Sequence, residues 1–274
     1  MPELPEVETT CQGISPHISG KTITSIDIRN GSLRWPVSEE IYQIKNVTLA
    51  QKNCVTRRAK YILIALPDEA HIIIHLGMSG SLRIASPDED LKKHDHLIFN
   101  ICSGLQMRYH DPRRFGCVLW TDKPVSEHAL FKKLGPEPLT DAFSSSYLLE
   151  KSKLKKKVIK QHIMDNHIVV GVGNIYACEA LFMAGIHPQR EAGKISKARI
   201  SNLRETIRHV LQRSIDQGGT TLKDFIQSDG QPGYFKQQLN VYDREGKPCR
   251  KCEATIKRVV IGQRSTFYCP KCQK

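Results

Sequence analysis

Four cysteines near the end of the chain constrain its fold more than any other feature. Cys249 and Cys252 form one C-x-x-C pair, Cys269 and Cys272 form a second, and sixteen residues separate the two pairs. Two close thiolate pairs can complete a tetrahedron of sulfur around zinc and leave no position open for a substrate. The pattern predicts one structural Zn²⁺ in a small unit over residues 246–274. Two disulfides are the alternative.

The segment between the cysteine pairs predicts a β-hairpin and not a helix, because β-prone runs flank the turn Gly262-Gln263-Arg264. Residues 247–274 carry eight Lys/Arg and a single acid, Glu253. A small unit pinned by a metal and covered in positive charge suits a phosphate backbone. Arg264 at the turn can reach a ligand. Its alternative role is that of a solvated cation.

The whole chain is basic, with a formal net charge of +13 over 274 residues. That charge implies a polyanionic partner, most simply nucleic acid. The run 151–160 holds six lysines and no acid, and Gly171-Val172-Gly173-Asn174 follows it and opens a helix. Helix amino ends bind phosphate well, so the two segments predict a phosphate clamp. The alternatives are a solvated helix face and an N-cap at Asn174.

Hydrophobic patterning divides the chain. From about residue 22 to 121, short β-like runs separated by turns predict an antiparallel sandwich or barrel, and a helix limited by Gly13 and Pro16 precedes them. Beyond a Gly/Pro/Ser-rich linker the apolar period becomes helical, with helices over 174–184 and from Ser196 to Gly218. Residues 217–238 are glycine-rich and predict a mobile loop. The five remaining cysteines are expected to be free, buried thiols.

No apolar run approaches the length of a membrane span, and the start lacks the basic-then-apolar pattern of a signal peptide. We therefore expect a cytoplasmic protein without membrane contact. Because the basic surface is needed for a nucleic-acid partner, a monomer is expected.

The first eight residues, Met1-Pro2-Glu3-Leu4-Pro5-Glu6-Val7-Glu8, have two interpretations. Loss of Met1 would make Pro2 a free secondary amine beside carboxylates. An α-amino group titrates near pH 7.7–8, so a nucleophile with an acid beside it is available for covalent catalysis. The simpler interpretation is a helix start, since proline suits the first turn and glutamate suits the positive end of the dipole.

Three further segments contain candidate functional residues. The turn His110–Gly116 holds Arg113 and Phe115, which suit insertion into a duplex, with Phe wedging a base step and Arg bonding base edges. Met78, at the tip of a second glycine-flanked turn, is either a similar wedge or ordinary core. Lys60 begins an apolar strand, where its ammonium can reach a cleft or simply mark a strand edge.

Taken together, these motifs resemble the formamidopyrimidine-DNA glycosylases, the bacterial base-excision repair family that also contains endonuclease VIII. The resemblance covers the whole chain and rests, in order, on PELPEVE, RRAKY, HLGMSG, DPRRFG, LGPEPL, VGVGNIYA, GIHP, GGTTLKDF, PGYF and QRSTFYC. Leu4 favours the formamidopyrimidine enzymes, because endonuclease VIII has glycine at this place.

The resemblance implies a two-lobed α+β fold. A catalytic β-sandwich with a leading helix would span residues 1–135, a linker 136–150, a helix–two-turn–helix DNA-binding domain 151–245 and the zinc finger 246–274. Double-stranded DNA with oxidised bases or abasic sites would be the partner, and the damaged nucleotide would be flipped out of the stack. The implied activity is excision of 8-oxoguanine and formamidopyrimidines, followed by β- and δ-elimination.

The family also implies roles for individual residues. Pro2 is the nucleophile that forms a Schiff base, and Glu3 is the acid/base for the sugar oxygen. Glu6 helps to position the lesion, Lys60 serves β-elimination and phosphate contact, and Arg264 serves the second elimination and grips the lesion phosphate. The positions that match DNA contacts are Met78, His94, Arg113, Phe115, Lys155, Lys160 and Asn174.

Two other functions remain open from the sequence. A preference for oxidised pyrimidines, as in endonuclease VIII, is one. A DNA-binding protein without enzymatic activity, built from a sandwich and a zinc finger, is the other, and only the N-terminal amine and its carboxylates discriminate against it.

Overall fold

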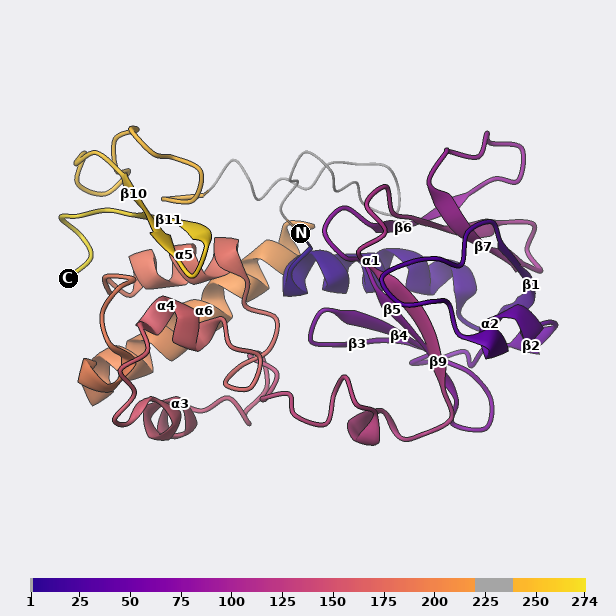
Figure 1. Ribbon diagram of the computed structural model, residues 1–274, viewed down its shortest axis with the longest axis horizontal. Coiled ribbons are helices and arrows are strands. Elements are labelled where there is room, and N and C mark those ends of the chain that lie inside the picture. Colours follow the sequence, from indigo (N-terminus) through magenta and orange to yellow (C-terminus); the bar gives the residue numbers. More distant parts are fainter. Residues whose placement is uncertain (1, 220–238) are drawn as a thin grey trace. The chain divides into compact units, whose positions relative to one another are not determined.

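The computed structural model describes residues 2–219 and 239–274, which form two compact units (Figure 1). Among the described residues, unit 1 comprises 2–132 with 217–219, and unit 2 comprises 133–216 with 239–274. Antiparallel sheets fill the first unit and helices dominate the second, which confirms the predicted α+β class. The glycine-rich segment expected to be a loop lies, from residue 220 to 238, outside the described residues.

Unit 1 contains two antiparallel sheets. The five-stranded sheet has the order β2-β1-β7-β8-β6, and its strands are β1 (Thr22–Ile28), β2 (Val47–Thr48), β6 (Ser81–Ala85), β7 (Asp95–Ile101) and β8 (Gln106–His110). The four-stranded sheet has the order β3-β4-β5-β9, and its strands are β3 (Val55–Arg58), β4 (Tyr61–Ala65), β5 (His71–His75) and β9 (Cys117–Thr121). One apolar core includes residues of both sheets, such as Ile62 and Ile72 of the four-stranded sheet and Phe99 and Met107 of the five-stranded sheet.

Helix α1 (Leu4–Ile18) packs against β3 and β4 of one sheet and β6 of the other. The prediction that Gly13 and Pro16 limit this helix was wrong, since the helix continues to Ile18. Burial explains the difference: Ile14 and Ile18 are both fully buried in the sandwich core. Their burial stabilises the last turn by about 2 kcal/mol each, which offsets the hydrogen bond that Pro16 cannot donate.

Four of the five single cysteines are buried as expected, and Cys102 is the exception. It follows β7 at the tight turn that leads to Gly104 (φ +81°), where the chain leaves the core. A short helix, α2 (Glu39–Gln43), and a 3₁₀ turn, η1 (Val125–Glu127), complete this unit.

Unit 2 is built around two helices. Helix α5 (Asn174–Met183) is buried on nearly all sides, and α6 (Lys197–Asp216) packs against it with an apolar stripe that includes Leu203 and Leu211. The shorter elements are α3 (Ser145–Ser152), α4 (Ile159–Ile163) and the 3₁₀ turn η2 (Ala192–Lys194). Helix α3 begins inside the range 136–150 that was expected to be a linker, because Ser144 caps it by accepting the Tyr147 N–H.

The finger is the predicted hairpin, formed by β10 (Lys257–Ile261) and β11 (Arg264–Tyr268), and β11 packs on α5 (Figure 1). Ile261 pairs with Arg264, so Gly262 and Gln263 form a two-residue turn, and both have positive φ (55° and 60°). That is the conformation of a tight hairpin turn. Among the helices of residues 2–219 and 239–274, none combines the length and apolar character that a membrane crossing requires.

Candidate functional site

The first turn of α1 gathers two buried carboxylates directly after Pro2. Glu3 is the N-cap, and it forms a reciprocal capping box with Glu6, whose Oε2 accepts the Glu3 N–H at 2.8 Å. Glu3 and Glu6 are 3% and 2% exposed. The helix start predicted from the sequence is therefore confirmed. Because Glu6 binds the backbone of Glu3, it fixes the residue that carries the predicted acid.

Lys60 lies in the tightest connection of the four-stranded sheet. Arg58 pairs with Tyr61, so Ala59 and Lys60 alone link β3 to β4. Ala59 has φ +55° and its side chain is buried. An L-residue in this region carries a cost of about 1–2 kcal/mol relative to ordinary conformations. Backbone strain is thus located beside the lysine that the sequence singled out.

His75 lies close to Lys60 and was missed by the sequence analysis. Its Nδ1 accepts the Gly77 N–H at 3.0 Å, and its ring packs on Tyr61 at 4.8 Å between centroids. Burial, reinforced by the positive charges of Lys60 and Arg34, lowers the pKa of His75 to about 4. The imidazole is therefore neutral at physiological pH, with its proton on Nε2.

The two glycine-flanked turns that carry Met78 and Phe115 pack on one another. Gly77 has φ +64°, and a Cβ on it would lie 2.5 Å from the backbone N of Gly116. Only glycine allows this approach. Met78 and Phe115 are 40% and 46% exposed, and both line a cavity of about 420 Å³ together with His75 and Arg34. The structure thus brings two predicted wedge residues to one apolar site.

Arg113 extends this apolar site with a charge, since its guanidinium lies 4.7 Å from the centre of the Phe115 ring. Asp111 stabilises this turn: it is fully buried, and its carboxylate accepts the Gly116 N–H at 2.8 Å. A cation stacked on an exposed aromatic ring forms a flat surface that suits a nucleic-acid base.

His94 precedes β7, and its backbone is joined to the same turn because its carbonyl accepts the Asp111 N–H. The next residue, Asp95, is a buried hub. It accepts two hydrogen bonds from Arg83, one from His110 Nδ1 and one from the Lys92 N–H. Burial alone would raise the pKa of Asp95, but these donors hold it well below its usual range.

In unit 2, Asn174 is the first residue of α5 and lies against the finger. Its Nδ2 donates to the Ser265 carbonyl at 2.9 Å, and its Oδ1 accepts from Lys160 Nζ. Lys160 also donates to Thr266 Oγ1 at 2.6 Å and is only 1% exposed. The expectation that Lys160 contacts DNA is therefore corrected: its ammonium lies inside the protein and connects α4, α5 and β11. Lys155, in contrast, is exposed.

Arg264 stands at the start of β11 and is exposed. It lines a cavity of about 250 Å³ with Lys157, Gln161 and Gly262. This cavity lies where the basic segment before α4 meets the finger turn, so two basic features predicted separately come together within unit 2.

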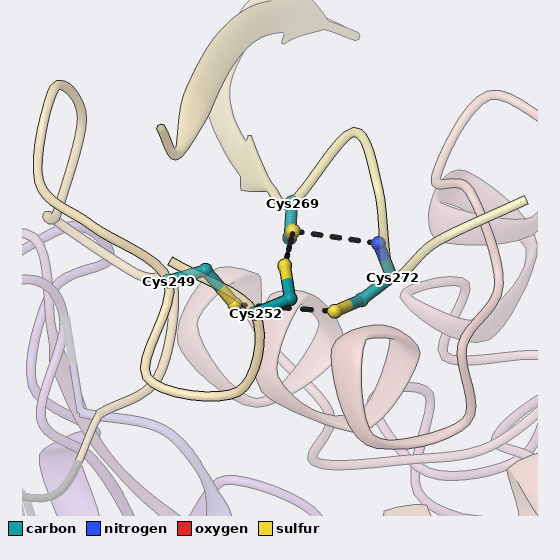
Figure 2. A group of neighbouring side chains, drawn as sticks. All are labelled: Cys249, Cys252, Cys269 and Cys272. Atoms are coloured by element: carbon teal, nitrogen blue, oxygen red, sulfur yellow. Dashed lines mark hydrogen bonds between the residues drawn. The ribbon is translucent and has the colours of Figure 1, made fainter. Parts of the chain in front are cut away.

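The four cysteines of the finger form a metal site (Figure 2). Their sulfurs all lie within 4.8 Å of one another, with Cys249 and Cys272 4.0 Å apart and Cys252 and Cys269 3.4 Å apart. Zn–S bonds of about 2.3 Å in a tetrahedron place sulfurs about 3.8 Å apart, so the geometry fits one Zn²⁺. The Cys272 N–H points at Cys269 Sγ, which stabilises a thiolate (Figure 2).

Comparison with known families accounts for nearly the whole chain. Residues 1–118 match the formamidopyrimidine-DNA glycosylase N-terminal domain, 134–226 the formamidopyrimidine-DNA glycosylase H2TH domain, and 246–274 the zinc finger found in FPG and IleRS. The chain belongs to the formamidopyrimidine-DNA glycosylase family. The resemblance inferred from the motifs is confirmed, as are the zinc and the fold of each part.

Individual relatives agree with this assignment. The formamidopyrimidine-DNA glycosylase of Klebsiella pneumoniae is 56% identical over 274 residues and covers all of both chains. Two solved structures of the Lactococcus lactis FPG protein are each 33% identical and cover all of both chains. One holds DNA containing Fapy-dG (TM-score 0.90), and the other holds DNA containing an oxidised pyrimidine (TM-score 0.91).

Within this formamidopyrimidine-DNA glycosylase fold, the residues that the sequence analysis missed are mostly supports. Asp95, Asp111 and Glu179 are buried acids that bind backbone or arginine, and Glu179 accepts the N–H groups of Val241 and Tyr242. Asp111 lies within the DPRRFG motif, but none of these acids gave a spacing signal for its partners, which only the folded chain identifies.

Proposed function

We propose that this protein is a bifunctional DNA glycosylase and AP lyase that removes oxidised purines, such as 8-oxoguanine and formamidopyrimidines, from duplex DNA in base-excision repair. The observation that carries the proposal is the start of α1. Pro2 immediately precedes a helix whose first turn holds two buried carboxylates, Glu3 and Glu6. This arrangement occurs in a chain that matches the family in its N-terminal, H2TH and finger segments.

The first stage replaces the base with the protein. After removal of Met1, the lone pair of the Pro2 nitrogen forms a bond to C1′ of the flipped nucleotide, and the C1′–N bond breaks with its electron pair on the departing base. The Pro2 nitrogen then loses its proton, and the base takes up one proton. The regained nitrogen lone pair forms the C=N bond as the C1′–O4′ bond opens, Glu3 donates a proton to O4′, and a cationic iminium remains between Pro2 and C1′. Glu6 keeps Glu3 in place through its backbone N–H.

The second stage cleaves the strand. The iminium withdraws electrons, so a proton leaves C2′ and the 3′ phosphate departs with the C3′–O electron pair. In the second elimination a proton leaves C4′, and the 5′ phosphate departs with the C5′–O electron pair. Lys60 serves the first elimination and contacts phosphate, and Arg264 grips the lesion phosphate during the second. The electrostatic field of these cations favours departure of a phosphate dianion.

Flipping a base requires that the vacated space be filled. Met78 and Phe115 share an apolar cavity, and Arg113 stacks on Phe115, so this trio suits insertion into the duplex with Arg113 toward the orphaned cytosine. His94, Lys155 and Asn174 would bind the DNA backbone. Lys160 would act through Asn174, because its ammonium donates to the Asn174 side chain.

A covalent trap tests this function. Sodium borohydride should reduce the iminium and join the protein to duplex DNA that carries 8-oxoguanine opposite cytosine. A protein that retains Met1, or that carries Pro2→Gly, should lose most of the trapped complex, whereas full trapping with a blocked N-terminus would refute the mechanism. Glu3→Gln separates the enzyme from a mere binding protein, since only the enzyme should lose base release.

Oxidised pyrimidines are a second candidate substrate class, because a solved FPG structure with a TM-score of 0.91 holds DNA containing an oxidised pyrimidine. Cleavage of duplexes with thymine glycol and with 8-oxoguanine, compared under the same conditions, tests this. Faster cleavage of thymine glycol would replace the purine assignment. The protein would act as a monomer on chromosomal DNA in the bacterial cytoplasm.

A further inference from the structure

We propose that Glu8 is a positioning residue for Lys60, acting through Arg57 on the strained turn that carries the lysine. This inference rests on the proposed role of Lys60 in elimination. Three observations carry it: the conformation of the turn, the contact that Arg57 makes with the turn, and the location of Glu8 on α1, the helix that follows the predicted nucleophile Pro2.

The turn has a demanding geometry. Ala59 and Lys60 are the two central residues of the hairpin between β3 and β4, and Ala59 has φ +55°. Glycine is the residue that normally occupies such a first central position, since it has no Cβ to clash with the following carbonyl. A strained conformation at a functional position persists only where surrounding groups hold it.

Arg57 supplies such a constraint from within the same hairpin. Its Nη1 donates to the Ala59 carbonyl at 2.9 Å, which fixes the peptide group between Ala59 and Lys60. The Arg57 side chain is only 9% exposed, so the bond is sheltered from water. The orientation of this peptide sets the direction in which the Lys60 side chain leaves the backbone.

Glu8 orients Arg57. Its Oε2 accepts from Arg57 Nε at 2.8 Å, so the guanidinium is held at one edge by a carboxylate while another edge binds the turn. Glu8 lies on α1, the helix whose first turn contains Glu3 and Glu6. The ion pair therefore links the helix that follows Pro2 to the turn that carries Lys60, within one compact unit.

The distance between two catalytic groups matters because small displacements are costly. A misplacement of about 1 Å can lower a rate by about a hundredfold. The Glu8–Arg57 pair fixes the register between α1 and the hairpin, and a second bond, from Cys11 Sγ to the Thr56 carbonyl, joins the same two elements one turn further along α1. We therefore assign the pair to elimination and not to attack by Pro2.

The test separates elimination from formation of the iminium. Single-turnover cleavage of duplex DNA containing an abasic site measures elimination, and borohydride trapping on the same DNA measures iminium formation. Glu8→Ala should slow elimination about tenfold and leave the trapping rate within about twofold of the parent. Gln12→Ala is the matched control, because Gln12 lies one turn later on the same helix, is exposed, and contacts the other oxygen of Glu8. It should change neither rate.

A second substitution tests whether Glu8→Ala slows elimination through the turn that carries Lys60. Ala59→Gly removes the Cβ that makes the turn strained, so the turn no longer needs the clamp. Glu8→Ala combined with Ala59→Gly should therefore recover most of the elimination rate. Recovery is not expected if Glu8 only stabilises the fold, and its absence would overturn the proposal. An equal loss of trapping and elimination in Glu8→Ala would overturn it as well.

Lys60→Gln distinguishes failure of this inference from failure of the proposed function. If Lys60→Gln slows elimination and Glu8→Ala does not, the clamp is refuted and the function of Lys60 stands. If Lys60→Gln eliminates at the parental rate, the assigned role of Lys60 is wrong and the positioning role of Glu8 is wrong with it.

Discussion

The backbone N–H of Glu3 donates to the carboxylate of Glu6 at 2.8 Å, and both residues are almost fully buried. Two acids that the sequence assigned to separate roles are thus one structural pair. Glu6 is both a predicted site residue and the residue that completes the capping box with Glu3 at the start of α1. Loss of Glu6 should therefore affect both the stability of the helix start and the position of Glu3, and different substitutions can separate the two effects.

Glu6→Ala removes the acceptor, so we expect a loss of about 1 kcal/mol in the free energy of unfolding, as for other lost helix caps. Glu6→Gln keeps an acceptor oxygen and should unfold within about 0.5 kcal/mol of the parent. Urea unfolding measures both. If positioning of Glu3 matters for ring opening, trapping with borohydride should fall further in Glu6→Ala than in Glu6→Gln. An equal loss of trapping in the two variants, relative to the parent protein, would show that only the Glu6 charge matters.

Asp95→Asn breaks a buried hub that receives two bonds from Arg83 and one from His110. Removing one partner of a buried pair costs about 3–5 kcal/mol, and we expect a loss near the lower figure at pH 7. Because the folded-state pKa of Asp95 is held below its unfolded value, its contribution is fully present above about pH 5. The difference between parent and variant should shrink as the pH falls below about 4.

Urea unfolding at pH 7, 4 and 3 checks this dependence. Asp27→Asn is the control, since Asp27 lies exposed on a neighbouring strand of the same sheet and its carboxylate accepts a hydrogen bond from the Asn100 amide. It should cost less than about 0.5 kcal/mol at every pH. A constant difference for Asp95→Asn between pH 7 and 3 would contradict the depressed pKa.

The sequence predicted the parts of the fold that repeat or follow spacing rules. The β-runs, the helix after Gly173 and the finger hairpin were found because alternation, helical period and cysteine spacing are local signals. The end of α1 was placed wrongly, since burial of Ile18 overrides the local effect of Pro16. Tertiary packing of this kind is not encoded in any short window.

In the candidate site, too, the sequence identified individual residues but not the contacts between them. Motif residues such as Met78 and Phe115 were identified, but their shared cavity depends on the approach of two glycine turns distant in sequence. Lys160 was assigned to DNA as part of the lysine run 151–160, which together with the helix start at Asn174 predicted a phosphate clamp. Its actual burial depends on Asn174 and Thr266, which supply oxygen acceptors from two other elements. Polar partners across elements are visible only after folding.

His75 predicts a second pH dependence, of the same sign as that of Asp95 but at higher pH. The folded-state pKa of His75, about 4, lies below the unfolded value near 6.5. Between these two pH values the imidazole is protonated in the unfolded chain and neutral in the folded chain. Stability should therefore fall as the pH drops from about 6.5 toward 4, by about 2 kcal/mol at pH 5. His75→Gln cannot titrate and should lose this part of the slope. Urea unfolding at pH 7, 6 and 5 measures it, and parallel slopes for the two proteins would refute a neutral buried imidazole.

Removal of zinc should affect DNA binding through the finger. The free energy of zinc binding in such four-ligand sites is about 10–16 kcal/mol, so a chelator that removes the ion should unfold the hairpin that carries Arg264. We expect one zinc per chain by elemental analysis, loss of that zinc in Cys252→Ala, and a loss of affinity for abasic-site DNA together with slower elimination. Cys102→Ser is the control, because Cys102 is exposed and lies outside the metal cluster. Unchanged DNA affinity in the zinc-free protein would show that the finger binds DNA without needing its metal-fixed shape.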